Sequence, residues 1–334
     1  MSAVRPLGYT LALLFFFAGD PAAVAQAPSP HPPVSSSGPA TWPARPIELI
    51  VPWTAGGSVD IVARGMAQAM SDRLGQNVFV SNRDGAAGTL GFRQLAAAPA
   101  DGYTLGAGPA TPITNAPYLV KGVRYDASAF EYICQYFENV FAVVVRADSP
   151  HKTARDFIAA AAASPVKLNY GSAGVGSIGH LSAETLAEAL KLKVQHVPFR
   201  GDAAALPVLL KGDLDFAVLA VASVRDQNVR VLAVFSDRRQ ASLPDVPTAK
   251  ELGVATPMVQ GLNGIFAPRG LPANVREALE TACAAAVRTE AVNRTTINAG
   301  QVIDYLTGLQ FRDRVVADYA FKGELIKRLG LESQ

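Results

Sequence analysis

The hydrophobic positions of this chain alternate between short apolar runs and longer segments with helical spacing. Residues 47–51 form an apolar run of strand length that is followed by Gly56 and Gly57. From Ser58 onward, apolar residues recur at about the helical period as far as Leu74. This stretch predicts a buried strand, a tight glycine turn and a helix with Ser58 as its N-cap.

The same alternation continues along the rest of the chain. It predicts strands at residues 77–82, 103–107, 137–146, 167–170, 194–199, 214–219, 229–235 and 261–267. It predicts helices at residues 89–97, 154–163, 180–190, 203–210, 273–288 and 311–329. Strands that alternate with helices indicate an α/β architecture with a parallel sheet covered on both faces. The long apolar strand 137–146 and its partner 261–267 are expected to cross between two lobes.

Two predicted α/β units each have a glycine-rich turn after their first strand, at Gly56-Gly57 and at Gly174-x-Gly176. Ligands bind at the carboxyl ends of parallel strands, where both turns should lie. The opening N–H groups of a helix have no internal partner and carry partial positive charge. Two facing turns of this kind predict a cleft for a small anion. An ordinary strand-to-helix turn without a ligand remains the alternative for the first of them.

Composition indicates a globular protein of ordinary type. The chain has 334 residues, which is enough for two domains. Hydrophobic residues make up 49% of it and charged residues 17%, a composition typical of folded and not of disordered proteins. The formal net charge of +2 gives no strong basic field, which argues against nucleic acid as the main partner.

The first forty residues carry a targeting pattern. Arg5 precedes the apolar run 11–17, and small residues at 23–25 form a cleavage site. Residues 1–25 are therefore predicted to be a secretory signal peptide. Residues 26–41 are rich in proline and serine and are predicted to be a flexible linker.

Two cysteines, Cys134 and Cys283, have two possible states. They could pair in an oxidising compartment, or both could be buried free thiols, and we slightly favour free thiols. The four histidines show no metal-ligand spacing, so we expect no metal and no cofactor.

The best enzyme interpretation rests on Gly174-x-Gly176-x-x-Gly179, which matches the dinucleotide-binding fingerprint. The next strand ends near Arg200, which would suit a 2′-phosphate, so the alternative function is an NADP-dependent oxidoreductase. Secretion argues against it, because free nicotinamide cofactors belong to the cytoplasm.

A serine hydrolase is the other enzyme class to weigh. A nucleophile elbow around Ser177 would need glycine where the chain has Val175. No acid is clearly placed to orient His180 or His196, so no nucleophile is assembled with its base.

Two residues near the first turn keep two interpretations each. Asp60 could stabilise the first helical turn or accept a hydrogen bond from a ligand. Trp53 could line a ligand site or pack in the core.

Several motifs occur along nearly the whole chain, about residues 42–331. They are Trp42-Pro43-x-Arg45-Pro46-Ile47, Val51-Pro52-Trp53-x-x-Gly56-Gly57-x-x-Asp60, Asn82-Arg83-x-Gly85-Ala86-x-Gly88, Pro99-x-Asp101-Gly102-Tyr103-Thr104-Leu105, Leu168-Asn169-Tyr170-Gly171-Ser172-Ala173-Gly174-x-Gly176-Ser177, His180-Leu181, His196-Val197-Pro198-Phe199-x-Gly201 and Leu243-Pro244-Asp245-Val246-Pro247-Thr248. Together they resemble the motifs of the periplasmic solute-binding proteins of tripartite tricarboxylate transporters, the Bug or TctC-like family.

The resemblance implies a two-lobed periplasmic-binding-protein fold, type II-like, with two crossing strands and a ligand cleft between the lobes. Lobe 1 would comprise residues 42–142 and 263–334, and lobe 2 residues 143–262. It implies a periplasmic, monomeric binder that is not an enzyme and does not bind nucleic acid. Its partners would be a small carboxylate and the permease subunits of a tripartite transporter, or a sensor kinase.

The family's ligand-binding positions, carried over to this chain, lie in three loops. They are Trp53, Thr54, Ala55, Gly56, Gly57, Ser58, Asp60, Pro109, Ala110, Thr111, Ser172, Ala173, Gly174, Ser177 and Phe199, with Asn115 nearby. The resemblance implies that backbone N–H groups hold one ligand carboxylate, and Gly57→Val is expected to abolish binding.

Two departures from the family pattern bear on the ligand. Pro109 stands where members often have a hydroxyl residue, and proline lacks even the N–H. Residues 216–221 are wholly apolar where members often carry a polar residue. Fewer polar contacts at the distal end of the pocket favour an aromatic or aliphatic monocarboxylate over citrate.

Overall fold

The computed structural model describes residues 42–254, 259 and 261–331. The predicted signal peptide and linker, residues 1–41, lie outside the described residues. None of the helices in the described part of the chain has the length and hydrophobicity that a membrane span requires.

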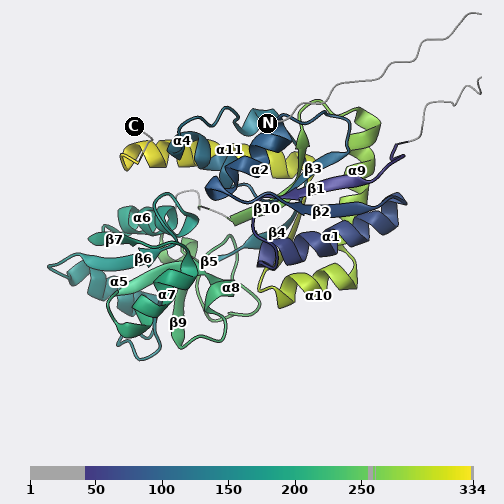
Figure 1. The fold of residues 1–334 in the computed structure, drawn as a ribbon. Coiled ribbons are helices and arrows are strands. Elements are labelled where there is room, and N and C mark those ends of the chain that lie inside the picture. The colour runs from purple at the N-terminus through teal and green to yellow at the C-terminus, as the bar shows by residue number, and fades with distance from the viewer. Residues whose placement is uncertain (1–41, 255–258, 260, 332–334) are drawn as a thin grey trace, which may run out of the picture. The chain divides into compact units, whose positions relative to one another are not determined.

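The first of two sheets has six strands in the order β11-β4-β10-β3-β1-β2 (Figure 1). Its strands are β1 Ile47–Val51, β2 Val78–Asn82, β3 Thr104–Pro109, β4 Phe130–Asn139, β10 Gly261–Pro268 and β11 Val302–Thr307. The helices along these segments are α1 Ser58–Leu74, α2 Thr89–Ala96, α3 Thr111–Thr114, α4 Ala116–Leu119, α9 Ala273–Val287, α10 Glu290–Asn298 and α11 Gly308–Arg328. Short 3₁₀ turns occur at Ala86–Gly88 and Ala127–Ala129.

The second sheet has five strands in the order β7-β6-β8-β5-β9. They are β5 Phe141–Arg146, β6 Leu168–Ser172, β7 Val194–Pro198, β8 Phe216–Ala220 and β9 Val229–Phe235. The helices of this part are α5 Ala154–Ala163, α6 Ile178–Leu190, α7 Asp202–Lys211 and α8 Val221–Val224, and a 3₁₀ turn follows at Lys250–Leu252.

Both sheets are mixed, so the prediction of a parallel sheet is correct for only some of the strands. The strands β2, β1 and β3 are parallel, as are β7, β6 and β8. The strands β10, β4 and β11 pair antiparallel, and β5 is antiparallel to β8 and β9. The alternation of strand and helix therefore predicts only the parallel part of each sheet.

The predicted strand 137–146 is two strands that meet at Val140. β4 ends at Asn139 in the first sheet, and β5 begins at Phe141 in the second. The apolar run hides this break because both strands are buried. The predicted strand 261–267 is β10, which pairs only within the first sheet. Most of the segment that would make the return crossing, residues 255–258 and 260, lies outside the described residues.

Helix α1 shows why the chain folds this way. Its buried positions Val62, Met66 and Met70 recur at helical spacing and pack in one core cluster with Leu49 of β1 and Ile133 of β4. Burying each such side chain contributes roughly 1.5–3 kcal/mol.

The C-terminal helix α11 contributes to the cores of both sheets. Phe311 and Val315 pack in a cluster with Phe266 of β10. About three turns later, Leu325 and Ile326 pack in the cluster that surrounds β6 and β8. This helix therefore ties the two halves of the described chain together.

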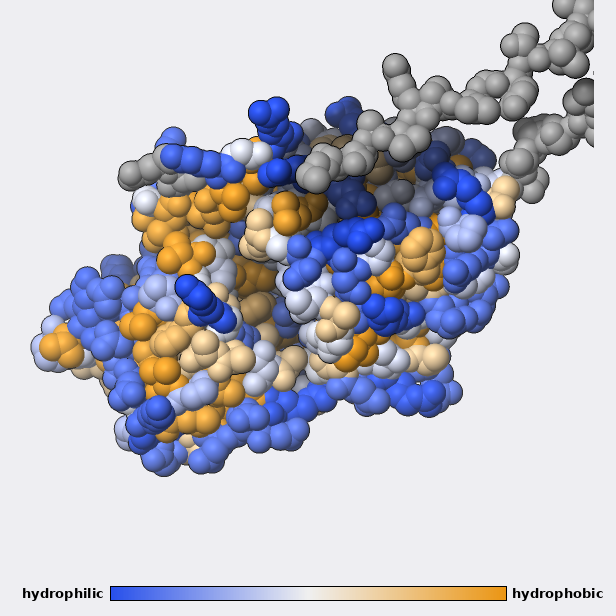
Figure 2. Space-filling view, in the orientation of Figure 1, coloured by the Kyte–Doolittle hydropathy of each residue, from blue (hydrophilic) through white to orange (hydrophobic). Residues whose placement is uncertain are grey.

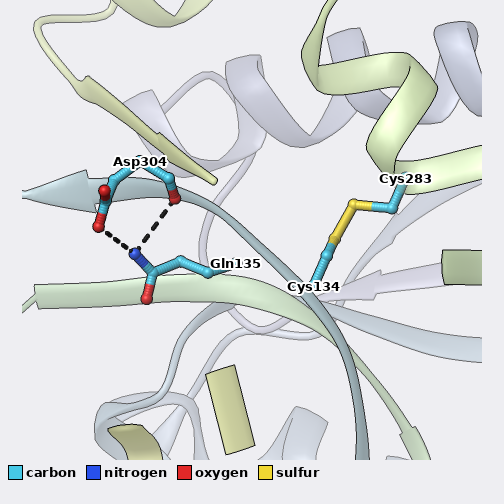
Figure 3. The surroundings of a disulfide bond; sticks show 4 residues. All are labelled: Cys134, Gln135, Cys283 and Asp304. Atoms are coloured by element: carbon cyan, nitrogen blue, oxygen red, sulfur yellow. Dashed lines mark hydrogen bonds between the residues drawn. A yellow bond between two sulfur atoms is a disulfide. The ribbon is translucent and has the colours of Figure 1, made fainter. Parts of the chain in front are cut away.

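Cys134 of β4 and Cys283 of α9 form a disulfide (Figure 3), so the preference for free thiols was wrong. Both residues are fully buried in one core cluster because α9 packs against β4. They lie 149 positions apart, and no local pattern shows that α9 lies over β4. Next to the disulfide, Gln135 Nε2 of β4 donates 2.6 Å to Asp304 Oδ2 of β11 (Figure 3).

Candidate functional site

A cleft of about 810 Å³ is lined by residues from both sheets. On the face drawn in Figure 2 the surface is hollowed, and hydrophobic residues gather beside the hollow. The polar side chains that line the cleft are Ser58, Thr111, Asn115, Asn139, Ser177, Asp202, Ser223, Asn263 and Gln301.

Six of the predicted ligand-binding residues line this cleft. They are Trp53, Ser58, Pro109, Thr111, Ala173 and Ser177. The other nine lie outside the lining, and they are Thr54, Ala55, Gly56, Gly57, Asp60, Ala110, Ser172, Gly174 and Phe199. The structure therefore brings the three predicted loops to one cleft, although nine of the fifteen predicted residues do not line it.

The first glycine loop is held by Asp60, a buried carboxylate. Asp60 Oδ2 accepts hydrogen bonds of 2.9 Å from Gly56 N and from Arg64 Nε, and Oδ1 accepts 2.8 Å from Asn82 Nδ2. Burial raises the pKa of Asp60, but these three donors together hold it below its usual value. The Gly56 N–H is therefore used inside the loop, and Asp60 fixes the loop instead of lining the cleft.

The start of α1 corrects the prediction that Ser58 is the N-cap. The N-cap of α1 is Gly57, and Ser58 is the first helical residue; its hydroxyl accepts 3.2 Å from Gln301 Nε2. Gly57 has a φ of −73°, and an added Cβ would meet only Thr54 O at 3.6 Å, an ordinary contact. A Cβ therefore finds room at Gly57, and the effect of Gly57→Val on ligand binding stays a prediction.

The second glycine loop is fastened by two histidines. Ser172 Oγ is 2.8 Å from His196 Nε2 and 3.3 Å from Ser177 Oγ, which caps α6 by accepting from His180 N. His180 Nδ1 accepts 2.9 Å from Gly176 N, and the two imidazole rings stack with centroids 3.9 Å apart. Burial lowers the pKa of both histidines to about 4, so both are neutral near pH 7 and fix the loop as hydrogen-bonding groups.

The glycines of the dinucleotide fingerprint have packing roles within this chain. A Cβ on Gly176 would lie 2.2 Å from Leu119 Cδ1, and one on Gly179 would lie 2.3 Å from Val218 O. Arg200, which was assigned to a 2′-phosphate, is exposed and outside the cleft lining. Close packing therefore explains the spacing without a nucleotide.

Helix N-termini give the cleft its electrostatic character. Three helices contribute their starts to its lining. Ser58 belongs to α1, Ser177 and Ile178 belong to the start of α6, and residues 201–203 belong to the start of α7. Among the described residues that line the cleft there is no lysine, arginine or histidine, and Asp202 is the only ionisable side chain. The partial positive charge at helix starts and the uncharged polar side chains of the lining are therefore the available means of binding an anion.

Sequence reasoning missed Asp202, Asn263 and Gln301 in this cleft. Asp202 follows Gly201 at the start of a predicted helix, a position that could have marked it. Gln301 precedes β11, and both lie in a segment that the hydrophobic pattern left unassigned. Asn263 lies in an apolar strand and carried no signal.

Comparison with known proteins identifies the family. Residues 62–331 match the family described as "Tripartite tricarboxylate transporter family receptor", TctC. A TctC solute binding protein from Polaromonas, solved without ligand, is 30% identical with a TM-score of 0.78, and the match covers 86% of this chain and 100% of that one.

Two further solved structures are similar over nearly their whole length. The periplasmic binding protein BugD is 30% identical with a TM-score of 0.70, over 88% of this chain and 100% of its own. Rpa4515 from R. palustris, solved with adipate, is 28% identical with a TM-score of 0.72, over 86% of this chain and 98% of its own. These matches agree with the two mixed sheets and the cleft described above, and the chain belongs to the TctC or Bug family of periplasmic solute-binding receptors.

Proposed function

We propose that this protein captures a small monocarboxylate in the cleft between its two sheets and delivers it to the membrane subunits of a transporter or to a sensor kinase. The observation that supports the proposal is that the first turns of α1 and α6 line the same cleft. The described residues that line this cleft include no cationic side chain. An anion there would be bound by preorganised N–H groups, which are favourable partners for a carboxylate.

The relatives support a carboxylate but leave its type open. The R. palustris protein was solved with adipate, a dicarboxylate. In this chain the apolar residues Val175, Ala220 and Ala222 line the cleft together with Phe141 and Leu119. A long apolar wall favours a ligand with one charged end and a hydrocarbon body.

A thermal-shift screen of the purified protein tests the proposal. The protein is first unfolded and refolded without reductant, which removes any ligand that was carried through purification and keeps the disulfide. A carboxylate at 100 times its dissociation constant should add about 2.7 kcal/mol to the free energy of unfolding. Stabilisation by monocarboxylates supports the proposal, and a panel of carboxylates without any effect would refute it.

Ser58→Asp localises the binding to the cleft. A carboxylate in the first turn of α1 stabilises that helix by about 0.3–1 kcal/mol but repels a bound anion, so ligand affinity should fall about tenfold or more while the free protein keeps its stability. The matched control is Asn274→Asp in the first turn of α9, which is exposed and outside the cleft. Equal affinity in both variants would contradict the site.

A further inference from the structure

A second cavity lies beside the ligand cleft and shares helix α8 with it as a wall. Its volume is about 760 Å³, close to that of the cleft and within the usual range of small-molecule sites. Val221 and Val224 of α8 line this second cavity, whereas Ala222 and Ser223 of the same helix line the cleft. Gln301 lines both. The second cavity is therefore a neighbour of the cleft with walls of its own.

The edges of both sheets border the second cavity. β9 stands at one end of the strand order of the second sheet, and β11 stands at one end of the first. Consecutive residues of each strand line the cavity, 229–231 of β9 and 302–303 of β11. Because side chains alternate between the two faces of a strand, consecutive lining residues indicate that the strand edges border the cavity. The space exists because no strand of the described chain joins these two edges.

Apolar side chains make up most of the wall of the second cavity. Ile297, near the end of α10, is 56% exposed and belongs to this wall. The partly exposed apolar residues of the wall are Val221, Val229, Val231, Leu243, Val246, Val302 and Ile303. Exposed apolar residues that gather around one hollow mark a binding site, whereas single ones scattered over a surface are ordinary. An apolar molecule that entered this space would cover them from water, which is favourable.

Arg225 supplies a positive charge at the wall of the second cavity. It is exposed, and its Nη2 donates 3.2 Å to the carbonyl oxygen of Ile297. The same nitrogen would lie 3.7 Å from a Cβ added to Gly300. Ile297 and Gly300 both line the cavity, so the guanidinium is held at its wall. A guanidinium has five N–H donors, and the bond to Ile297 uses only one of them.

Two further ionisable residues line the second cavity, Arg230 and Asp226. The Arg230 guanidinium is held elsewhere, because Nη1 donates 3.4 Å to Ser149 O and 3.3 Å to His151 O, and neither residue lines the cavity. Asp226 is exposed and forms no ion pair with Arg225 in the described part of the chain. The described lining thus carries two positive charges and one negative charge, a balance that favours an anion.

The second cavity and the cleft differ in what they offer an anion. The cleft has helix starts and, among its described lining residues, no cationic side chain, whereas the second cavity has a guanidinium beside an apolar wall. A guanidinium pairs with a carboxylate through two parallel N–H···O bonds. A molecule with one carboxylate and a hydrocarbon body matches both the charge and the wall of the second cavity.

We infer that the second cavity is a binding site for an amphipathic monocarboxylate, separate from the cleft. The hydrocarbon body of this ligand lies between the edges of β9 and β11, and its carboxylate pairs with Arg225. The inference goes beyond the proposed function and does not depend on what the cleft binds.

Octanoate and 1-octanol, which have alkyl chains of the same length, test the inference by calorimetry. Both are titrated into Ser58→Asp, the variant whose cleft is expected to repel anions. Octanoate should still bind this variant at one site, about tenfold or more tightly than uncharged 1-octanol, because hydrogen bonds to charged groups are the stronger ones. No binding of octanoate to Ser58→Asp would overturn the inference, and the proposed function would stand if carboxylates still bound the unchanged protein.

Ile297→Glu tests where this site lies. The position is exposed, so the fold should persist, while the new carboxylate stands near Arg225 and repels an anion. Added to Ser58→Asp, this change should weaken octanoate binding about tenfold or more. The matched control is Val316→Glu, which alters an exposed apolar residue of α11 outside both cavities and should leave the affinity unchanged. Equal affinities in the two variants would place the octanoate site elsewhere and overturn the inference.

Arg225→Gln tests the charge. In the Ser58→Asp protein it should lower the affinity for octanoate about tenfold and leave the affinity for 1-octanol unchanged. Arg294→Gln, an exposed position of α10 outside both cavities, is the control and should alter neither affinity. An unchanged octanoate affinity in Arg225→Gln, or an equal loss for octanoate and 1-octanol, would show that Arg225 does not pair with the carboxylate and would overturn the inference.

Discussion

The Asn115 side chain donates a hydrogen bond of 2.8 Å from Nδ2 to the carbonyl oxygen of Gly176. Asn115 lies between the short helices α3 and α4 that follow the first sheet, and Gly176 lies in the glycine loop of the second sheet. Both residues line the cleft, and Asn115 is 3% exposed. Its own Oδ1 accepts 2.9 Å from Thr114 Oγ1, so the amide is fully oriented for this contact between the halves of the binding site.

Asn115→Asp is expected to destabilise the protein. The substitution replaces the donor with an oxygen that faces the Gly176 carbonyl, and losing a buried hydrogen bond in this way costs about 1–3 kcal/mol. Denaturant unfolding of the ligand-free protein measures it. Asn228→Asp, at an exposed position outside the cleft, makes the same chemical change and should alter stability by less than about 0.5 kcal/mol. Equal effects would show that the contact with Gly176 contributes nothing.

A buried ion pair stands behind this contact. Lys322 Nζ of α11 is 2.6 Å from Asp318 Oδ2 and donates 3.1 Å to Thr114 Oγ1, the hydroxyl that orients Asn115. Burial raises the pKa of Asp318, although Lys322 opposes the rise. The C-terminal helix thus supports the cleft through a chain of polar contacts.

Lys322→Met should destabilise the protein by about 3–5 kcal/mol, because it leaves the Asp318 carboxylate buried without a partner. The double variant Lys322→Met/Asp318→Leu should recover most of that loss, since no charge then remains. The control is Arg328→Met, which breaks an exposed pair with Glu188 and should cost about 0–1 kcal/mol. Urea unfolding of the unchanged protein and the three variants measures these free energies. A double variant as unstable as Lys322→Met would contradict the explanation.

The sequence predicted the parts of the fold that local pattern specifies. β1, the glycine turn and α1 follow from an apolar run, two glycines and helical spacing. The segment around α10 and β11 was not assigned, although Val302, Ile303, Tyr305 and Leu306 give β11 a short apolar pattern. The break at Val140 was invisible because the hydrophobic pattern does not change where the chain leaves one sheet for the other.

The sequence predicted which loops form the candidate site, but it predicted only some of the residues that line it. The two predicted glycine turns precede α1 and α6, and the starts of both helices line the cleft. Which side chain faces the cleft depends on hydrogen bonds within each loop, such as the contact that turns Asp60 toward Gly56. Gln301 and Cys283 depend on packing between distant segments, which no local pattern records.

Glu138 of β4 is a buried carboxylate near Arg314 of α11, with 3.7 Å between Oε2 and the guanidinium nitrogen. It is 5% exposed, and Oε1 has no hydrogen-bond partner among the described residues. Burial raises the pKa of Glu138 to about 7 from a reference value of 4.5, against the attraction of Arg314. The folded state therefore holds this proton more tightly than the unfolded state does.

The sign of the pH dependence follows from that difference. The stabilising contribution of Glu138 is fully present below pH 4.5 and is lost as the pH rises through about 7, a change of about 3 kcal/mol. His180 and His196 act in the opposite direction, because their lowered pKa values cost stability as the pH falls below 6.5. The curve of the unchanged protein thus mixes two opposing effects, and only a difference between variants isolates Glu138.

Glu138→Gln provides that difference. Glutamine resembles the protonated side chain at every pH, so the variant should lose less stability than the unchanged protein between pH 5 and pH 8, by about 2–3 kcal/mol. The histidines are the same in both proteins and cancel. Urea unfolding at several pH values measures the difference, with Glu277→Gln on the exposed face of α9 as the control. Parallel pH curves for Glu138→Gln and the unchanged protein would mean that Glu138 is ionised in the folded state over this whole range.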